Sequence, residues 1–361
     1  MLYWLLYPLA DHFSVFNVFR YITFRAAGAT VTALALSLLL GRPFIAWLRQ
    51  MSMGQSIRDV GPASHQVKAG TPTMGGLLIL FALTVPTLLW ANLTNVYVWL
   101  VFGTTLAFGA VGFWDDFVKV RKKRNLGLTA RAKMLLQIVA ALAFACLLYS
   151  LRQELGFSDT LAFPFFKKAV FNLGLLYVPL VVSVLVGASN AVNLTDGLDG
   201  LAIGATLIAA GTYAVFSYVA GNSVAARYLQ VPYVPGAGEL AVFCGAMVGA
   251  SLGFLWFNAH PAEVFMGDVG SLAIGGAIGS VAVVAKQELV LVLVGGLFVL
   301  EALSVIVQVV SFKLRGKRVL RMAPLHHHFE LGGWAEPKII VRFWILAILF
   351  ALLSLSTLKL R

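Results

Sequence analysis

Residues 269–311 read VGSLAIGGAIGSVAVVAKQELVLVLVGGLFVLEALSVIVQVVS and contain only three charged side chains, Lys286, Glu288 and Glu301. The hydrocarbon core of a bilayer is about 30 Å thick, so a helix needs roughly 20 apolar residues to cross it. The stretch is long enough for two crossings separated by residues 286–288. We therefore predict membrane-spanning helices at 269–285 and 289–311.

The same criterion, applied outward along the chain, predicts ten spans in all. The other eight are expected at 22–41, 73–91, 96–115, 132–151, 173–190, 200–220, 239–257 and 339–358. The apolar runs are continuous, which favours helices over the short alternating strands of a membrane β-barrel. The expected fold is an all-α integral membrane protein in which residues 1–361 form a single transmembrane catalytic domain. No cleaved signal peptide is expected.

Composition excludes a water-soluble globular protein. The chain of 361 residues is 60% hydrophobic and 12% charged, with a mean hydropathy of +0.88. Soluble domains carry roughly twice that charged fraction. Cys146 and Cys244 lie in separate apolar runs, which excludes a disulfide framework and a CxxC metal site. The net charge of +12 indicates basic loops at an anionic membrane face, or anionic substrates, and no nucleic acid is expected as a partner.

Basic residues predict the orientation. The loops after odd-numbered spans carry 17 Lys and Arg residues, against 5 after even-numbered spans. The positive-inside rule therefore places the odd loops in the cytoplasm. With ten spans, both termini are expected on the outer, periplasmic side.

Polar residues that the composition does not explain fall almost entirely on these odd loops. They are Lys68 before span 2, Asp115 and Asp116 at the end of span 3, Asn190, Asn193, Asp196 and Asp199 after span 5, Asn258, His260, Glu263 and Asp268 after span 7, and His326, His327 and His328 after span 9. The candidate catalytic groups are therefore expected to converge on one cytoplasmic surface.

The pair Asp115–Asp116 is unusual because carboxylates at a helix C-terminus face the negative end of the helix dipole. A solvated pair is the plain alternative. A divalent cation or a catalytic role would explain the pair better, since Mg²⁺ binds one or two carboxylates together with substrate phosphates. The basic run 119–124 is interpreted mainly as a topology signal.

The stretch 190–200, NAVNLTDGLDG, is the most specific polar signal. If it is helical from Thr195, Asp196 and Asp199 share one face. Glycines in it permit a ligand to approach the backbone closely. Capping of the next span is the alternative, and it explains one residue better than four.

Asp268 begins span 8, where it could simply cap the helix. A helix N-terminus also attracts anions, so Asp268 with Mg²⁺ could hold a diphosphate. Asn258 and Phe265 nearby offer an amide that can read a base edge and a ring on which a base can stack. The three consecutive histidines 326–328 cannot all point at one metal, which favours contacts to phosphate, with an ordinary interfacial loop as the alternative.

Glu301 lies in the middle of span 9, and an intramembrane carboxylate is a candidate functional residue by default. Ser304 and Gln308 follow on the same helical face. We expect Glu301 to belong to an internal hydrogen-bonded seam and Gln308, nearer the cytoplasm, to line the site.

Acidic, amide and histidine groups at a water–lipid boundary suit a reaction between a lipid and a water-soluble substrate, and aspartates with Mg²⁺ indicate phosphoryl chemistry. No Walker A, kinase or Rossmann fingerprint is present. The competing class is an ion-coupled membrane transporter, which would place ionisable residues near the midplane. Only Glu301 does so.

Four motifs together resemble a known family. They are the pair Asp115–Asp116, NAVNLTDGLDGLA at 190–202, FNAHPAEVFMGDVGSL at 257–272 and PLHHHFE at 324–330. They resemble the phospho-N-acetylmuramoyl-pentapeptide-transferase (MraY) family, within the polyprenyl-phosphate N-acetylhexosamine-1-phosphate transferase superfamily. The resemblance covers essentially the whole chain.

The resemblance implies Mg²⁺-dependent transfer of phospho-N-acetylmuramoyl-pentapeptide from UDP to undecaprenyl phosphate. The products would be lipid I and UMP, in the first membrane step of peptidoglycan synthesis for the cell wall. It also implies a multi-pass protein of the bacterial cytoplasmic (inner) membrane with its active site facing the cytoplasm, a homodimer, membrane lipids as partners, and nucleoside antibiotics as inhibitors. A sister transferase that uses UDP-N-acetylglucosamine is the nearer alternative.

Family roles transfer to matching positions. The catalytic group would be Asp115, Asp116, Asp268 and His327, with Asp268 as the Mg²⁺ ligand. The substrate-binding residues would be Lys68, Lys133, Asn193, Asp196, Asp199, Asn258, Phe265, Gln308, His326 and His328. We expect the two neighbouring aspartates to position the lipid phosphate for one-step attack, rather than to form an aspartyl-phosphate.

Overall fold

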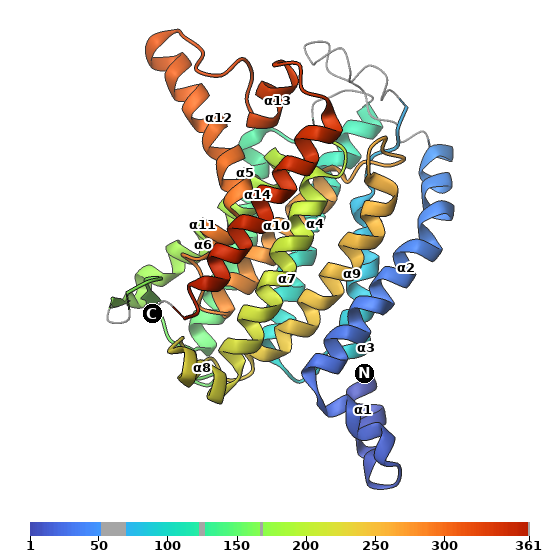
Figure 1. The fold of residues 1–361 in the computed structure, drawn as a ribbon, viewed down its shortest axis with the longest axis vertical. Coiled ribbons are helices and arrows are strands. Elements are labelled where there is room, and N and C mark those ends of the chain that lie inside the picture. Colours follow the sequence, from blue (N-terminus) through green and yellow to red (C-terminus); the bar gives the residue numbers. More distant parts are fainter. Residues whose placement is uncertain (52–69, 123–126, 167–168, 360–361) are drawn as a thin grey trace.

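The chain folds into a bundle of helices that follow the apolar runs of the sequence (Figure 1). The computed structural model describes residues 1–51, 70–122, 127–166 and 169–359. The α-helices are α1 (Leu2–Leu6), α2 (Ile22–Gln50), α3 (Gly76–Trp90), α4 (Val96–Lys122), α5 (Ala130–Leu151), α6 (Tyr177–Thr195), α7 (Leu201–Gly221), α8 (Ser223–Leu229), α9 (Leu240–Asn258), α10 (Gly267–Val284), α11 (Leu291–Val294), α12 (Gly296–Arg315), α13 (Leu325–Glu330) and α14 (Glu336–Ser356). Short 3-10 helices are η1 (Tyr7–Asp11), η2 (Ser14–Arg20), η4 (Gly174–Leu176) and η5 (Ala237–Glu239), and an antiparallel hairpin pairs β1 (Thr160–Ala162) with β2 (Val170–Asn172).

Each of the ten predicted spans overlaps a helix, so the all-α prediction is confirmed. Among the described residues, nine helices are long and apolar enough to cross a membrane. The predicted crossing at 73–91 coincides with α3, which has 15 residues and is shorter than that criterion. The count of ten and the side of the termini therefore stay predictions.

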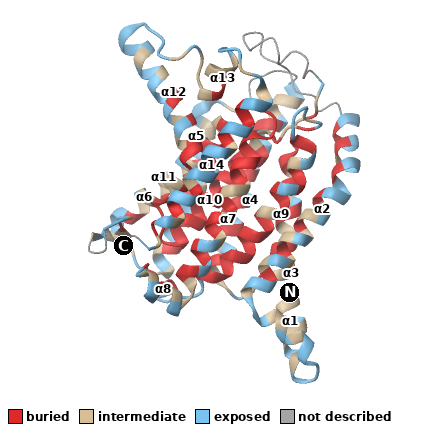
Figure 2. Cartoon of the chain, viewed as in Figure 1, coloured by how far each residue is buried: buried red, intermediate tan, exposed pale blue. Residues whose placement is uncertain are grey.

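Helix α10 forms the centre of the bundle. It contacts α3, α4, α6 and α7, and every residue from Val269 to Val284 is buried (Figure 2). Glycine and alanine make up much of its sequence, and small residues let neighbouring helices approach closely. A Cβ on Gly76 of α3, for example, would overlap the backbone of Gly270. The close packing fixes the start of α10, where Asp268 lies.

Peripheral helices show the opposite pattern. The C-terminal part of helix α12 leans away from the bundle (Figure 1), and α13 contacts α12 at Glu301, near the start of that helix. The α12 side chains Leu303, Ile306, Val307 and Val310 are all exposed. Contiguous apolar surface of this kind indicates contact with lipid or another protein, so the described structure supports an integral membrane protein.

Candidate active site

The three aspartates predicted to be catalytic meet in space. Asp115 and Asp116 come from α4 and Asp268 from the first turn of α10, and one oxygen from each lies within 4.8 Å of the others. The approach depends on glycine. A Cβ on Gly112 would overlap the Asp268 carbonyl, and a Cβ on Gly267, whose φ is +72°, would contact Asp116 Oδ2. The sequence therefore permits α4 and α10 to bring the carboxylates together.

Two lysines bind this aspartate cluster. Lys119 Nζ lies 2.6 Å from Asp115 Oδ2, 3.1 Å from Asp116 Oδ1 and 2.9 Å from Asp268 Oδ2. Lys133 Nζ, from α5, lies 2.7 Å from Asp268 Oδ2. Lys133, which is predicted to bind substrate, therefore lies at the aspartate cluster, and its contact with substrate stays a prediction. Lys119 was missed as a site residue, although its spacing of three and four residues from the aspartates on one helix would have indicated the contact.

One expectation about this pair is wrong. Asp115 and Asp116 are not at the end of their helix, because α4 continues to Lys122. Both carboxylates are buried, and Lys119 and the start of α10 supply their partners. The helix-dipole argument made from the sequence therefore does not describe their surroundings.

Each aspartate is also oriented by a neutral donor. Asp115 Oδ1 accepts a hydrogen bond from Leu128 N at 2.8 Å, and Asp116 Oδ2 accepts one from Val269 N at 3.1 Å. Asp268 Oδ1 accepts one from Asn193 Nδ2 at 2.8 Å. The donor set is entirely carboxylate oxygen, which is the ligand type that Mg²⁺ prefers. The residues present therefore fit a hard divalent cation.

The acidic turn between α6 and α7 differs from its prediction. Helix α6 ends at Thr195 and α7 begins at Leu201, so Asp196 and Asp199 do not share a helical face. Asn193 is not in a loop either, since it lies within α6. Burial, and after it the negative charges of Asp268, Asp116 and Asp199, together raise the pKa of the Asp196 carboxyl to about 8. Asp196 therefore lies within electrostatic reach of the aspartate cluster.

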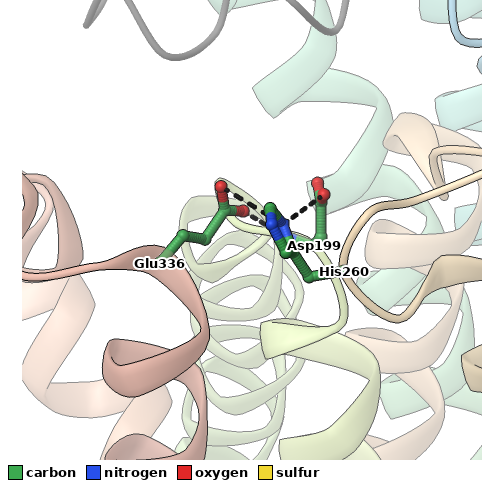
Figure 3. A group of neighbouring side chains, drawn as sticks. All are labelled: Asp199, His260 and Glu336. Carbon is green, nitrogen blue, oxygen red and sulfur yellow. Dashed lines mark hydrogen bonds and ion pairs between the residues drawn. The ribbon is translucent and has the colours of Figure 1, made fainter.

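Asp199 belongs to a second cluster with His260 and Glu336 (Figure 3). Asp199 comes from the turn before α7, His260 from the loop after α9, and Glu336 from the start of α14. His260 Nδ1 lies 3.1 Å from Asp199 Oδ2 and 3.6 Å from Glu336 Oε2. Glu336 Oε1 also accepts a hydrogen bond from Asp199 N at 2.9 Å. The ligand atoms of the three residues lie within 4.8 Å of one another and could hold a metal ion. Glu336 carried no sequence signal, and His260 was noted without a role.

Asn258 is buried, and its side chain forms hydrogen bonds with two backbone groups. Its Oδ1 accepts a hydrogen bond from Gly200 N at 3.0 Å, and its Nδ2 donates to Val264 O at 2.8 Å. These bonds connect the turn between α6 and α7 to the loop before α10. Hydrogen bonding of the amide to a base edge would therefore require these bonds to break. The backbone of Phe265 pairs with Pro72 O and Gly75 N. Stacking of its ring on a base stays a prediction.

The three histidines of α13 contact three different partners, as expected for consecutive side chains. His327 Nδ1 lies 3.0 Å from Glu330 Oε2. His328 Nδ1 accepts a hydrogen bond from Arg321 N at 3.1 Å. His326 is fully buried beside Glu301, which argues against the direct substrate contact expected of it.

Gln308 and Lys68 complete the predicted set. Gln308 Oε1 accepts hydrogen bonds from Val319 N and Leu320 N, and its Nε2 donates to Leu320 O. None of these bonds joins it to the aspartate cluster within the described ranges, so its place in the site stays a prediction. Lys68 lies outside the described residues.

Comparison with known proteins places the whole chain among transferases. Residues 98–286 match the model of glycosyl transferase family 4, and residues 68–80 match signature 1 of phospho-N-acetylmuramoyl-pentapeptide-transferase. The chain is 59% identical over 361 residues to the phospho-N-acetylmuramoyl-pentapeptide-transferase of Geobacter sp. (strain M21). It is 60% identical over 362 residues to that of Nitratidesulfovibrio vulgaris (strain DP4) and 57% over 379 residues to that of Koribacter versatilis (strain Ellin345). Each comparison covers 100% of both chains.

Proposed function

The chain belongs to the phospho-N-acetylmuramoyl-pentapeptide-transferase family, and we propose that its aspartate cluster is the place where the donor diphosphate is cleaved. The protein is a multi-pass bacterial membrane enzyme that transfers phospho-N-acetylmuramoyl-pentapeptide to a lipid carrier in peptidoglycan synthesis. We infer that the donor is the UDP-linked sugar, the acceptor is undecaprenyl phosphate, and the products are lipid I and UMP. The site would face the cytoplasm from the inner membrane.

The observation that carries this proposal is the meeting of Asp115, Asp116 and Asp268 around two lysines. Mg²⁺ bound by these carboxylates would stabilise the charge that develops on the departing UMP. The side chains of Lys119 and Lys133 are 31% and 18% exposed, so both can turn toward an incoming phosphate. Three carboxylates against two ammonium groups leave the negative charge that attracts a cation.

We propose one-step attack by the lipid phosphate. The second pKa of a phosphate monoester is about 6, so the acceptor is largely dianionic at neutral pH and needs little help from a general base. Asp115 and Asp116 would position it, directly or through the bound Mg²⁺, because their hydrogen bonds to Leu128 N and Val269 N fix their orientation. Exchange of label between UMP and the donor without lipid phosphate would instead support an aspartyl-phosphate intermediate.

The test is UMP release by the purified full chain in detergent, with both substrates and Mg²⁺. We expect release that requires the lipid phosphate and is lost with a chelator. Release from UDP-N-acetylglucosamine, but not from the muramoyl-pentapeptide donor, would identify the sister activity instead. A homodimer and inhibition by nucleoside antibiotics are proposed from the family resemblance. The transporter considered from the sequence is set aside, because the relatives are transferases.

A further inference from the structure

The mid-span carboxylate of Glu301 reaches out of its helix toward α13. Its Oε2 accepts a hydrogen bond from Leu325 N at 2.7 Å, and its Oε1 lies 3.2 Å from His326 Nδ1. Both side chains are at most 1% exposed. Two atoms of one carboxylate therefore contact the backbone and the ring at the start of α13. The carboxylate therefore lies beside the His326 ring as a close neighbour rather than as a hydrogen-bond partner, since neither Glu301 Oε1 nor His326 Nδ1 has a hydrogen bond among the described residues.

The opposite edge of that ring meets the acidic turn. A Cβ on Gly197 would overlap His326 Nε2 and would lie 2.8 Å from Cε1. Gly197 is not among the glycines with positive φ, so this position needs a glycine for space rather than for backbone conformation. Nε2 has no hydrogen-bond partner among the described residues. The ring thus acts on the turn through packing.

Glu301, His326 and Gly197 therefore form a continuous line of contact from α12 to the turn that carries Asp196 and Asp199. We propose that His326 and Glu301 are positioning residues: Glu301 fixes the imidazole, and the imidazole sets the position of this turn toward the nucleotide donor. His326 then acts without touching substrate. The inference rests on the proposed function, because it concerns how the same site is held in its working geometry.

The first test is a double-mutant cycle on the contact between ring and glycine. Gly197→Ala is expected to lower kcat/KM for the UDP donor by about tenfold to a hundredfold, since displacement of a positioning element by about 1 Å can cost this much. In the His326→Ala background, where the ring is gone, Gly197→Ala is expected to cost less than about twofold, since contacting residues are non-additive.

The matched control is Gly187→Ala. Gly187 lies on the exposed side of α6, ten residues earlier, and a Cβ there would meet nothing within 4 Å. This variant is expected to keep wild-type activity. If Gly197→Ala costs the same with and without the His326 ring, the proposed contact is wrong.

The second test separates positioning from general stability. Glu301→Gln keeps the size of the side chain and an acceptor for Leu325 N, but it loses the carboxylate beside His326. We expect the KM for the UDP donor to rise at least about threefold while the KM for the lipid phosphate stays unchanged. Ser304→Ala, one turn later, is the control, because the Ser304 hydroxyl, as far as the structure describes the chain, donates only to the Glu301 carbonyl of its own helix.

Two failures can be told apart. If the wild-type chain releases no UMP, the proposed function is wrong. If the wild-type chain is active and Glu301→Gln raises both KM values equally, or neither, Glu301 does not position the donor side of the site. Thermal unfolding of every variant in the same detergent shows whether a loss of activity comes from a loss of folded protein.

Discussion

Helix α10 carries lysine–carboxylate contacts at both of its ends, and the two ends differ in charge balance and access. In the first turn of α10, Asp268 contacts two lysines and lies beside two more aspartates. The side chain of Lys119, one of the two lysines, is 31% exposed. Just beyond the last residue of α10, Lys286 Nζ lies 2.9 Å from Glu288 Oε1, and both side chains are 0% exposed. The Tyr177 hydroxyl donates to the same Glu288 oxygen.

The difference separates a reactive cluster from a structural one. Lys286 and Glu288 balance each other's charge inside packed protein, which leaves no access for a ligand. At the Asp268 end the carboxylates outnumber the lysines and the lysines touch solvent. Perturbed, accessible and unbalanced charges are typical of functional sites, whereas a sealed pair mainly avoids an uncompensated buried charge.

The largest expected effect tests the accessible end. Asp268→Asn should leave the fold intact and reduce turnover at least about a hundredfold, because it removes a charge that acts on the transition state. Asp116→Asn should behave in the same way. UMP release measures the loss, and thermal unfolding checks the fold. Near-normal turnover in a well-folded variant would remove that aspartate from the mechanism.

At the other end of α10, where Lys286 and Glu288 are fully buried, a substitution is expected to reduce stability rather than turnover. Glu288→Gln leaves the Lys286 ammonium without its counter-charge, so we expect the free energy of unfolding to fall by about 2–3 kcal/mol. The folded fraction should turn over within about twofold of wild type. Thermal unfolding in detergent and UMP release normalised to folded protein measure the two quantities. A stable variant with impaired turnover would contradict the division between the two ends.

The positions of the helices could be predicted from the sequence because crossing a membrane requires long apolar runs. The helix ends could not. Helix α4 continues past Asp115 and Asp116, since their charges are met by Lys119 and by backbone of α10 rather than by solvent. A span predicted from hydropathy ends where polar residues begin. The helix itself can continue past that point when the polar side chains form hydrogen bonds or ion pairs with neighbouring elements.

The convergence of the site could be predicted in the same way, because the polar residues fall on loops of one side. Their pairings could not. Glu301 and His326 are far apart in sequence, and Glu336 carries no motif, so only the packing of α12, α13 and α14 reveals their contacts. Asn258 shows the converse, since its amide was predicted to read a base and instead holds two loops together.

The cluster of Asp199, His260 and Glu336 lies between the two extremes, because its carboxylates are nearly sealed while the His260 side chain is 36% exposed. If it orients Asp199 for the donor, His260→Ala should raise the KM for the UDP donor about threefold to tenfold with little change in kcat. Lys338→Ala, at an exposed position of α14, is the control. An unchanged donor KM would assign the cluster to structure alone.

The smallest expected effect concerns Asp196, whose carboxyl is buried within electrostatic reach of Asp116 and Asp268 at the start of α10. Its pKa is raised from an ordinary 3.8 to about 8, so the folded protein holds a proton that the unfolded chain releases. The stability that comes from this proton is fully present below about pH 4 and is lost as the pH rises to about 8. Between pH 6 and pH 8, the unfolding temperature of the wild type should therefore fall relative to that of Asp196→Asn by about 2 °C or more, and then level off. Thermal unfolding across this range measures the difference. If the gap between the two proteins stays constant from pH 6 to pH 9, burial and the neighbouring carboxylates do not raise the pKa of Asp196, and Asp196 does not belong with the aspartate cluster at the start of α10.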